Sequence, residues 1–408
     1  MKRGLILPIV LISILLLAEI GSFLVAKAYI SNSTNFNVKK FIWIWWISTI
    51  SVYALTFSSR MIDNTFIRNL IVNIFFILLI TKLVIALVFL IFTFFNWLRS
   101  LIFSVGKEEV EGILNSRRAF VSKVALSSAL LPIAGFSYGI VRTAYDFKVH
   151  KLKFKSPKIP NSFKGFKIVQ ISDIHTGSLQ GNYQLQKAIN LVMEQKPDLI
   201  VFTGDLVNNK TEEAFEFEPI LNQLKAPHGV FSTLGNHDYG DYASWDSEAE
   251  KDKNLQDMID FHTKIGWNLM LNNHVKIEKE NEFFSLIGIE NWGGNYNFKK
   301  YGDLHKAYEN IDKSSFQILL SHDPSHWNLQ VTTDFPEIDL TLAGHTHGFQ
   351  FGIEIPGFKW SPSKYIYPQW AGIYGTEKQK LYVNRGLGCL GYMGRIGIKP
   401  EITVIELD

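Results

Sequence analysis

The sequence predicts an α/β domain preceded by an all-α transmembrane region, and three observations support this division. The first 142 residues are mostly apolar, whereas nearly all Asp and Glu residues and all 11 histidines follow position 145. Four stretches of the first part are long and apolar enough to span a membrane. After position 145, short apolar runs alternate with amphipathic stretches, as in α/β domains. We therefore expect a membrane region at 1–142 and a globular α/β domain at 143–408.

The apolar stretches predict about four transmembrane helices and thus a multi-pass protein of the cell membrane, with the bilayer as a partner. The first run is longer than the core of a signal peptide, and further spans follow it. Tryptophan side chains near the span ends favour the headgroup layer. Lys82 interrupts the third stretch, and we expect it to face other helices. The expected spans cover about residues 4–30, 41–57, 66–98 and 119–141.

The orientation of the spans stays open. The motif Ser116-Arg117-Arg118-x-Phe120, followed by an apolar run, resembles a twin-arginine export signal and hints at an extracytoplasmic domain. The alternative is that the two arginines anchor a helix end. Basic residues lie on both sides of the spans, so the positive-inside rule does not decide between these readings.

Composition excludes several kinds of site. The net charge is only +3, without a basic stripe, and we expect no nucleic acid partner. The single cysteine, Cys389, rules out an intramolecular disulfide and a multi-cysteine metal site. The oligomeric state is left open.

The segment after the last span alternates lysine with apolar residues. Lys151, Lys153 and Lys155 flank Leu152 and Phe154, which is the period of a half-buried strand. A basic patch that attracts anionic lipid is a second interpretation, compatible with the first.

The rest of the chain predicts strands and helices of a single domain. Helical patterns cover about 185–195 and 212–224. The late strands, with few helices between them, suggest a second, mixed sheet. The expected strands are 166–173, 198–205, 229–238, 283–289, 316–323, 338–345, 381–386 and 402–407.

Five of these expected strands end in, or are followed directly by, polar side chains that can bind a metal. Ligands in α/β sheets gather beyond the carboxyl ends of strands, so we expect these side chains to converge. Taken singly, each has a plain alternative as a helix cap, a turn residue or a loop residue. Their occurrence together favours a metal site. The residues are Asp173, His175, Asp205, Asn236, His237, Asp238, His322, His345 and His347.

The order D-x-H … GD … GNHD … H … GHTH resembles the calcineurin-like metallophosphoesterase superfamily, in particular its membrane-linked bacterial members. The resemblance covers about residues 165–407, and the stretches YVNRGLG and KPEITVIEL strengthen it. It implies a four-layer sandwich, in which helices flank two mixed β-sheets.

The resemblance also implies a role for each residue. Asp173, His175 and His347 would hold one divalent ion, Asn236, His322 and His345 a second, and Asp205 would bridge the two. A metal-bridging hydroxide would attack a phosphate mono- or diester. His237 would stabilise the transition state or protonate the leaving oxygen, and Asp238 would orient His237. Histidine with carboxylate suits Mn, Fe or Zn, and the sequence does not choose among them.

Several functional questions have more than one answer at this stage. The membrane anchor motivates a lipid-linked substrate. The main alternative is a catalytically silent binding or scaffold module, and another is a transporter or sensor whose spans carry the function. The aromatic-rich segment 360–375 either lines the mouth of the site or packs on its own domain, and 291–297 is a second candidate rim. Arg385 is expected either to meet phosphate or to form a structural ion pair.

Overall fold

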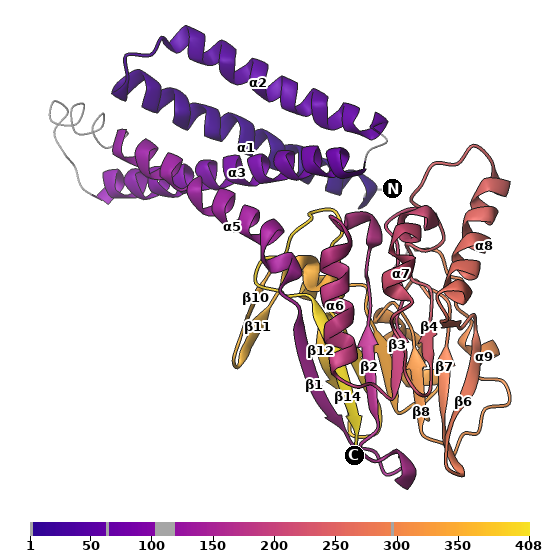
Figure 1. Ribbon diagram of the computed structural model, residues 1–408. Coiled ribbons are helices and arrows are strands. Elements are labelled where there is room, and N and C mark those ends of the chain that lie inside the picture. Colours follow the sequence, from indigo (N-terminus) through magenta and orange to yellow (C-terminus); the bar gives the residue numbers. More distant parts are fainter. Residues whose placement is uncertain (1–2, 63–64, 103–118, 295–297) are drawn as a thin grey trace. The chain divides into compact units, whose positions relative to one another are not determined.

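The chain forms two compact units in the computed structural model, Met1–Tyr138 and Gly139–Asp408 (Figure 1). The structure describes residues 3–62, 65–102, 119–294 and 298–408. The twin-arginine-like pair Arg117 and Arg118 lies outside the described residues.

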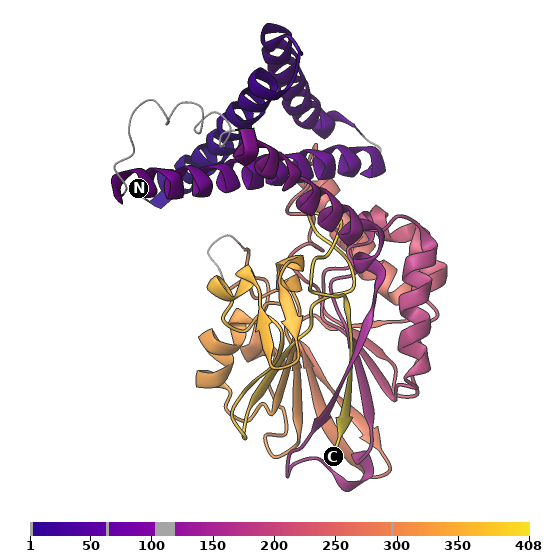
Figure 2. The same ribbon diagram turned by 90° about the vertical axis from the view of Figure 1, so that its left-hand side faces the viewer.

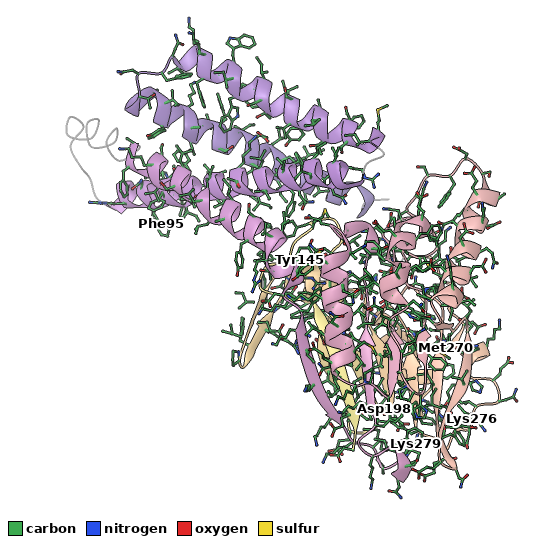
Figure 3. All side chains as sticks on the ribbon, in the orientation of Figure 1. Phe95, Tyr145, Asp198, Met270, Lys276 and Lys279 are labelled. Carbon is green, nitrogen blue, oxygen red and sulfur yellow. The ribbon has the colours of Figure 1, made fainter. Side chains whose placement is uncertain are left out.

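The described part of the apolar region 1–142 is largely helical, as expected. Its helices are α1 (Arg3–Ser33), α2 (Val38–Ser58), α3 (Thr65–Ile102) and α5 (Leu130–Val141), with a short 3-10 turn η1 (Ser59–Met61). Within the described part of the chain, four helices are long and apolar enough to cross a membrane, at Val10–Ser31, Val38–Ser58, Ile67–Arg99 and Ala119–Tyr145. Their apolar side chains are widely exposed, as at Phe95 on α3 (Figure 3), which fits lipid as the surrounding solvent.

Lys82 faces other helices, as its position predicts. Its Nζ lies 2.8 Å from Glu19 Oε2 on α1 and donates to Thr49 Oγ1 on α2 at 3.2 Å. The hydroxyl of Tyr53 donates to Glu19 at 3.2 Å. Charged residues in spans normally face the bundle interior and pair with one another. This polar cluster therefore ties three helices together.

Two six-stranded sheets build the second unit. The first has the order β1-β14-β2-β3-β4-β5 and the second the order β12-β13-β9-β8-β7-β6. Both are mixed, because parallel strands dominate while β14–β2, β6–β7 and β12–β13 pair antiparallel. The first sheet comprises β1 (Lys148–Phe154), β14 (Glu401–Leu407), β2 (Lys167–Ile171), β3 (Leu199–Phe202), β4 (Val230–Ser232) and β5 (Asn268–Leu269). The second comprises β12 (Gly372–Gly375), β13 (Lys380–Val383), β9 (Leu340–Ala343), β8 (Gln317–Leu320), β7 (Glu282–Gly288) and β6 (Asn273–Lys279).

The sheets pack face to face, and helices cover their outer faces (Figures 1 and 2). The interior between the sheets is apolar and includes Phe284 and Met270, the latter labelled in Figure 3. On the outer face of the first sheet lie α6 (Asn182–Glu194), α7 (Glu218–Leu221) and α8 (Glu248–Lys264). On the second lie α9 (Leu304–Ala307), a π-helical turn at Trp327–Val331 and α10 (Thr332–Asp334). The predicted α/β sandwich with flanking helices is confirmed.

Most predicted strands agree with the structure to within a few residues, because these strands are buried. The predicted strand 229–238 was too long, since β4 ends at Ser232. Every residue of β3 and of β8 is buried, and all four residues of β3 and the last three of β8 are apolar. Of the two predicted helices, 185–195 corresponds to α6. The stretch 212–224 is a 3-10 helix, η5 (Thr211–Phe217), followed by the four-residue α7.

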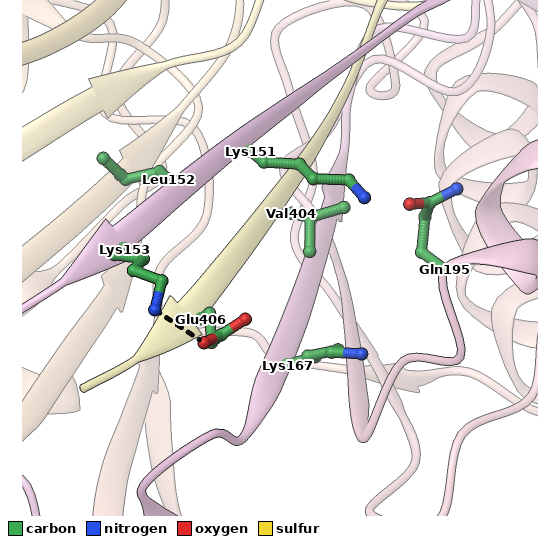
Figure 4. Close-up of a pocket in the computed structure, with 7 residues that line it drawn as sticks. All are labelled: Lys151, Leu152, Lys153, Lys167, Gln195, Val404 and Glu406. Atoms are coloured by element: carbon green, nitrogen blue, oxygen red, sulfur yellow. Dashed lines mark ion pairs between the residues drawn. The ribbon is translucent and has the colours of Figure 1, made fainter.

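The lysine-rich segment forms the edge strand β1, as predicted. Leu152 packs against the core between the sheets. Lys151 and Lys153 line a shallow hollow of about 220 Å³, where Lys153 pairs with Glu406 at 3.4 Å (Figure 4). Lysines on an edge strand discourage pairing with another chain. The lipid-binding interpretation of this patch stays a prediction.

Candidate metal centre

The polar residues predicted from strand ends gather where the two sheets present their carboxyl ends. β2 leads to Asp173 and His175, and β3 leads to Asp205. In the second sheet, β8 leads to His322, and β9 leads to His345 and His347. Because β2 and β3 run parallel, as do β8 and β9, their ends lie at one edge of each sheet.

Asp173, His175 and His347 form a first group. Each offers a ligand atom within 4.8 Å of the others, and all three are buried. The Nε2 atoms of His175 and His347 are 3.0 Å apart, and His347 Nε2 lies 3.4 Å from Asp173 Oδ1. Three donor atoms thus face one point, which is the arrangement that one cation needs.

Asp205, His322 and His345 form a second group on the same criterion. His322 Nε2 lies 3.0 Å from Asp205 Oδ2 and 3.2 Å from His345 Nδ1. Asp205 Oδ2 is also 3.6 Å from His175 Nε2, a member of the first group. The Asp205 carboxylate therefore lies between the two groups.

The outer ring nitrogens of two of these histidines are fixed by backbone carbonyl oxygens. His175 Nδ1 lies 3.1 Å from the Val207 carbonyl, and His322 Nδ1 lies 2.7 Å from the Thr203 carbonyl. A carbonyl only accepts, so each Nδ1 carries a proton and each Nε2 is the ring atom that faces the site. Metal-binding histidines use this arrangement to hold ring orientation and tautomer. Burial would lower the pKa of His322, but Asp205 raises it to about 10, so a cation would have to displace a proton from Nε2 of this ring.

Asn236 supplies a further test of whether the site suits a cation. Its side chain is buried, and its Nδ2 donates to the Tyr242 hydroxyl at 2.9 Å. Its Oδ1 is buried without a hydrogen-bond partner among the described residues. An orphaned buried acceptor is costly unless something absent from the chain binds it. A hard or borderline cation fits this oxygen and the neighbouring nitrogens.

The backbone conformation singles out the same residues. Five of the seven predicted ligands have left-handed φ angles: Asp173 (50°), His175 (48°), Asp205 (61°), His345 (73°) and His347 (49°). Each such residue costs about 1–3 kcal/mol, a strain that clusters at functional sites. The strands thus end in sharp turns that aim side chains at one another.

The protonation states of most of these side chains at neutral pH favour metal binding. Burial lowers the pKa of His175 to about 3 and that of His345 to about 4, so both imidazoles are neutral near pH 7. Burial would raise the pKa of Asp205, but the adjacent His322 holds it well below the usual range. Burial raises the pKa of Asp173 to about 7, so a cation competes with a proton there.

His237 and Asp238 have separate surroundings. His237 Nδ1 lies 2.6 Å from the Asn208 carbonyl, and its backbone N–H donates to Asp205 Oδ1 at 2.9 Å. The buried Asp238 carboxylate accepts from the backbone N–H groups of Asp205, Leu206, Val207 and Gly235. This differs from the expectation that Asp238 orients His237, because the structure gives that contact to Asn208. Asp238 instead holds the loop that carries Asp205.

Three residues at the site were not singled out from the sequence. The Tyr367 hydroxyl lies 2.8 Å from His345 Nε2, and the Tyr242 ring lies 4.5 Å from that of His237. Arg395, fully buried, places Nη2 3.3 Å from His347 Nδ1. Tyr242 follows the GNHD motif closely, and Tyr367 lies in the segment 360–375 already considered as a possible lining of the site. Arg395 comes from a distant loop that no spacing rule connects to the histidines.

The other candidates from the sequence are Arg385 and the two segments expected at the edge of the site. Arg385 is buried in ion pairs with Glu401 and Glu354, so the structural alternative holds. Segment 360–375 does both things expected of it, since Tyr367 reaches His345 while Trp370 packs in a small core. Of segment 291–297, residues 295–297 lie outside the described part of the chain.

Comparison with known proteins agrees with this geometry. Residues 166–349 match the family model "Calcineurin-like phosphoesterase", and residues 2–144 match "Probable Calcineurin-like phosphoesterase, transmembrane domain". The uncharacterized metallophosphoesterase YkuE of Bacillus subtilis is 34% identical over 72% of this chain and 97% of its own length.

Two other relatives have names that state an activity. The UDP-2,3-diacylglucosamine pyrophosphatase LpxG of Chlamydia muridarum is 29% identical over 64% of this chain and 88% of its own length. The phosphodiesterase YaeI of Escherichia coli is 27% identical over 72% of this chain and 99% of its own length.

Proposed function

The chain belongs to the calcineurin-like phosphoesterase family, and from this premise we propose that it is a binuclear-metal hydrolase of phosphate mono- or diesters, anchored in the cell membrane. Residues 143–408 would carry the reaction, and residues 1–142 would hold it at the bilayer. The observation that carries this proposal is the pair of three-residue groups, in which Asp205 of the second group lies 3.6 Å from His175 of the first.

Each residue has a role that its contacts support. The first ion would bind Asp173, His175 and His347, and the second Asn236, His322 and His345, with Asp205 shared. The unpartnered Oδ1 of Asn236 supports its place among the ligands. The donors suit Mn, Fe or Zn.

The two ions would supply positive charge for the phosphoryl oxygens and lower the pKa of a bound water to about 7. The chain supplies proton transfer and positioning. Because the Asn208 carbonyl holds the Nδ1–H of His237, the other ring nitrogen, Nε2, is the atom that would face the leaving oxygen, and it would give that oxygen a proton from the imidazolium form of the ring. Asp238 would keep the Asp205 loop in place through its four backbone contacts.

A lipid-linked substrate has support beyond the anchor. A cavity of about 190 Å³ adjoins Tyr367, the partner of His345. Its lining includes Leu329 and Ile366, which are 58% and 56% exposed, and the prolines 324 and 368. An apolar leaving group fits such a wall. The relative LpxG acts on a diacylated diphosphate by its name, which points to the same class of substrate.

The test is hydrolysis by the full chain in detergent, loaded with Mn, against a phosphomonoester, a phosphodiester and a lipid pyrophosphate. We expect metal-dependent turnover that is lost in Asp205→Ala together with bound metal, and lost in His237→Ala with metal retained. Bound metal without turnover on any of the three substrates would favour the scaffold alternative. Turnover that survives chelation would contradict the metal mechanism.

A further inference from the structure

A short antiparallel hairpin follows the histidine motif directly. We name β10 (Ile353–Ile355) and β11 (Phe358–Trp360), joined at Gly357, the apolar hairpin. Residues directly opposite in an antiparallel pair share one face. Ile353 pairs with Trp360 and Ile355 with Phe358, so one face of the hairpin is entirely apolar. Ile353, Ile355 and Phe358 are 49%, 58% and 53% exposed.

The opposite face is polar and is tied to the body of the unit. Glu354 pairs across the hairpin with Lys359. The Glu354 carboxylate forms an ion pair at 2.8 Å with the buried Arg385, and Lys359 Nζ donates to the Ala371 carbonyl. A hairpin in water normally buries its apolar face and shows its polar one. The apolar hairpin does the reverse, which indicates an apolar partner.

The base of the hairpin is joined to the end of a candidate membrane span within the same compact unit. Gly139 belongs to the span Ala119–Tyr145, and its carbonyl accepts from Arg395 N–H at 3.3 Å. The next residue, Ile396, bridges to Phe351 and accepts from Gly352 N–H at 2.9 Å. Hydrogen-bonded backbone segments lie about 5 Å apart, so the end of the span and the base of the hairpin are separated by about two such spacings.

The size and rim of the hairpin suit the interface of a bilayer. Three residues per strand make it about 10 Å long, and interfacial segments bury their apolar face about 5–10 Å deep. Tyr365, 72% exposed, lies under the Lys364 ammonium, which is 5.1 Å from its ring. Aromatic rings with lysines are typical of the headgroup layer, where lysine attracts anionic lipid.

We propose that the apolar hairpin inserts into the bilayer interface and holds the candidate metal centre at the lipid surface. His347 lies in the turn His347–Gln350 that leads into β10, so insertion fixes this part of the site relative to the lipid. A phosphate ester carried by a lipid would then be hydrolysed without leaving the membrane. This last consequence depends on the proposed function, whereas insertion itself does not.

Insertion is tested on the full chain in nanodiscs of phosphatidylcholine and phosphatidylglycerol. An environment-sensitive fluorophore is attached at Ile355→Cys or Phe358→Cys. The matched control is Lys313→Cys, on an exposed polar turn at the amino end of β8, away from the histidines. The unsubstituted chain, carried through labelling, reports the contribution of the buried Cys389.

We expect the two hairpin labels to be blue-shifted, quenched by spin-labelled lipid and protected from aqueous iodide, with the opposite behaviour at the control. Hairpin labels that behave like the control would overturn the proposal. Protection from iodide without quenching by lipid would also overturn it, because protein, such as a second copy of the chain, would then cover the face.

The link to activity is tested with the double variant Ile355→Ser/Phe358→Ser. Its matched control is Phe215→Ser, which removes another exposed aromatic side chain from a different part of the unit. We expect a loss of hydrolysis of a phosphodiester lipid in nanodiscs, with hydrolysis of a soluble phosphodiester unchanged. Equal loss on both substrates would contradict this link. A wild-type chain inactive on both would refute the proposed function, while the labelling result would still decide insertion.

Discussion

The role of Asp238 can be decided by one isosteric substitution, Asp238→Asn. The buried carboxylate accepts four backbone N–H groups, two on each oxygen. An amide keeps one oxygen and turns an NH2 group toward the other two donors, so two hydrogen bonds are lost. Hydrogen bonds to a charged group contribute about 1.5–3 kcal/mol each, so the two lost bonds are worth about 3–6 kcal/mol. Burial raises the pKa of Asp238 to about 7, so the buried charge is itself costly and its removal offsets part of this loss. We expect a net loss of about 3 kcal/mol.

The loss should appear as a lower unfolding temperature and weaker metal binding. For a unit of this size, about 3 kcal/mol corresponds to a fall in Tm of roughly 6–12 °C. Because the loop carries Asp205, we also expect metal affinity to fall by about 10–100-fold, as for residues that orient ligands. The assay is thermal unfolding and Mn titration of the full chain in detergent at pH 8. Unchanged Tm and metal affinity with reduced turnover would refute this reasoning and restore the role of orienting His237.

Three further predictions follow from individual contacts. His237→Ala should lower kcat by about 10²–10⁴-fold and leave the metal content unchanged. Turnover measures the first effect and elemental analysis the second. Loss of metal in this variant would show that His237 is a metal ligand instead. Tyr367→Phe removes the hydroxyl beside His345 Nε2, and we expect weaker Mn binding by titration with an unchanged Tm. A Mn affinity equal to that of the wild type would show that this contact does not support His345 as a ligand. Burial would raise the pKa of Glu401, but Arg385 lowers it from 4.5 to about 2. The ionised carboxylate therefore contributes roughly 3 kcal/mol to the free energy of unfolding above pH 4.5. This contribution is lost as the pH falls toward 2. Glu401→Gln should therefore lower Tm at pH 7 and much less near pH 2, and a pH-independent difference would contradict this assignment.

The sequence predicts the positions of the strands that carry the site because these strands are buried on both faces. β3 is apolar throughout and β8 is apolar after Gln317, and each is followed closely by a predicted ligand, Asp205 after β3 and His322 after β8. Elements whose formation depends on tertiary contacts were not predicted. α8 has a largely polar sequence, and only four of its residues are buried, so it lacks a broad apolar stripe.

The geometry around the predicted ligands could not be predicted for a similar reason. The contacts of Tyr367 and Arg395 with histidines join residues 22 and 48 positions apart through loops. The exposed face of the apolar hairpin also escapes the sequence, because Ile353, Ile355 and Phe358 read as an ordinary buried strand pair. The contacts of Glu354 with Arg385 and of Lys359 with the Ala371 carbonyl show that the polar face is the inner one.

The most direct test of the account is to count the metal ions bound to the purified full chain after saturation with Mn, beside Asp205→Ala. Because Asp205 lies between the two groups of ligands, the account predicts about two ions per chain in the wild type and loss of both in the variant. A wild-type chain that binds no ion, or a variant that retains both, would contradict the central claim that these side chains form one shared two-metal centre.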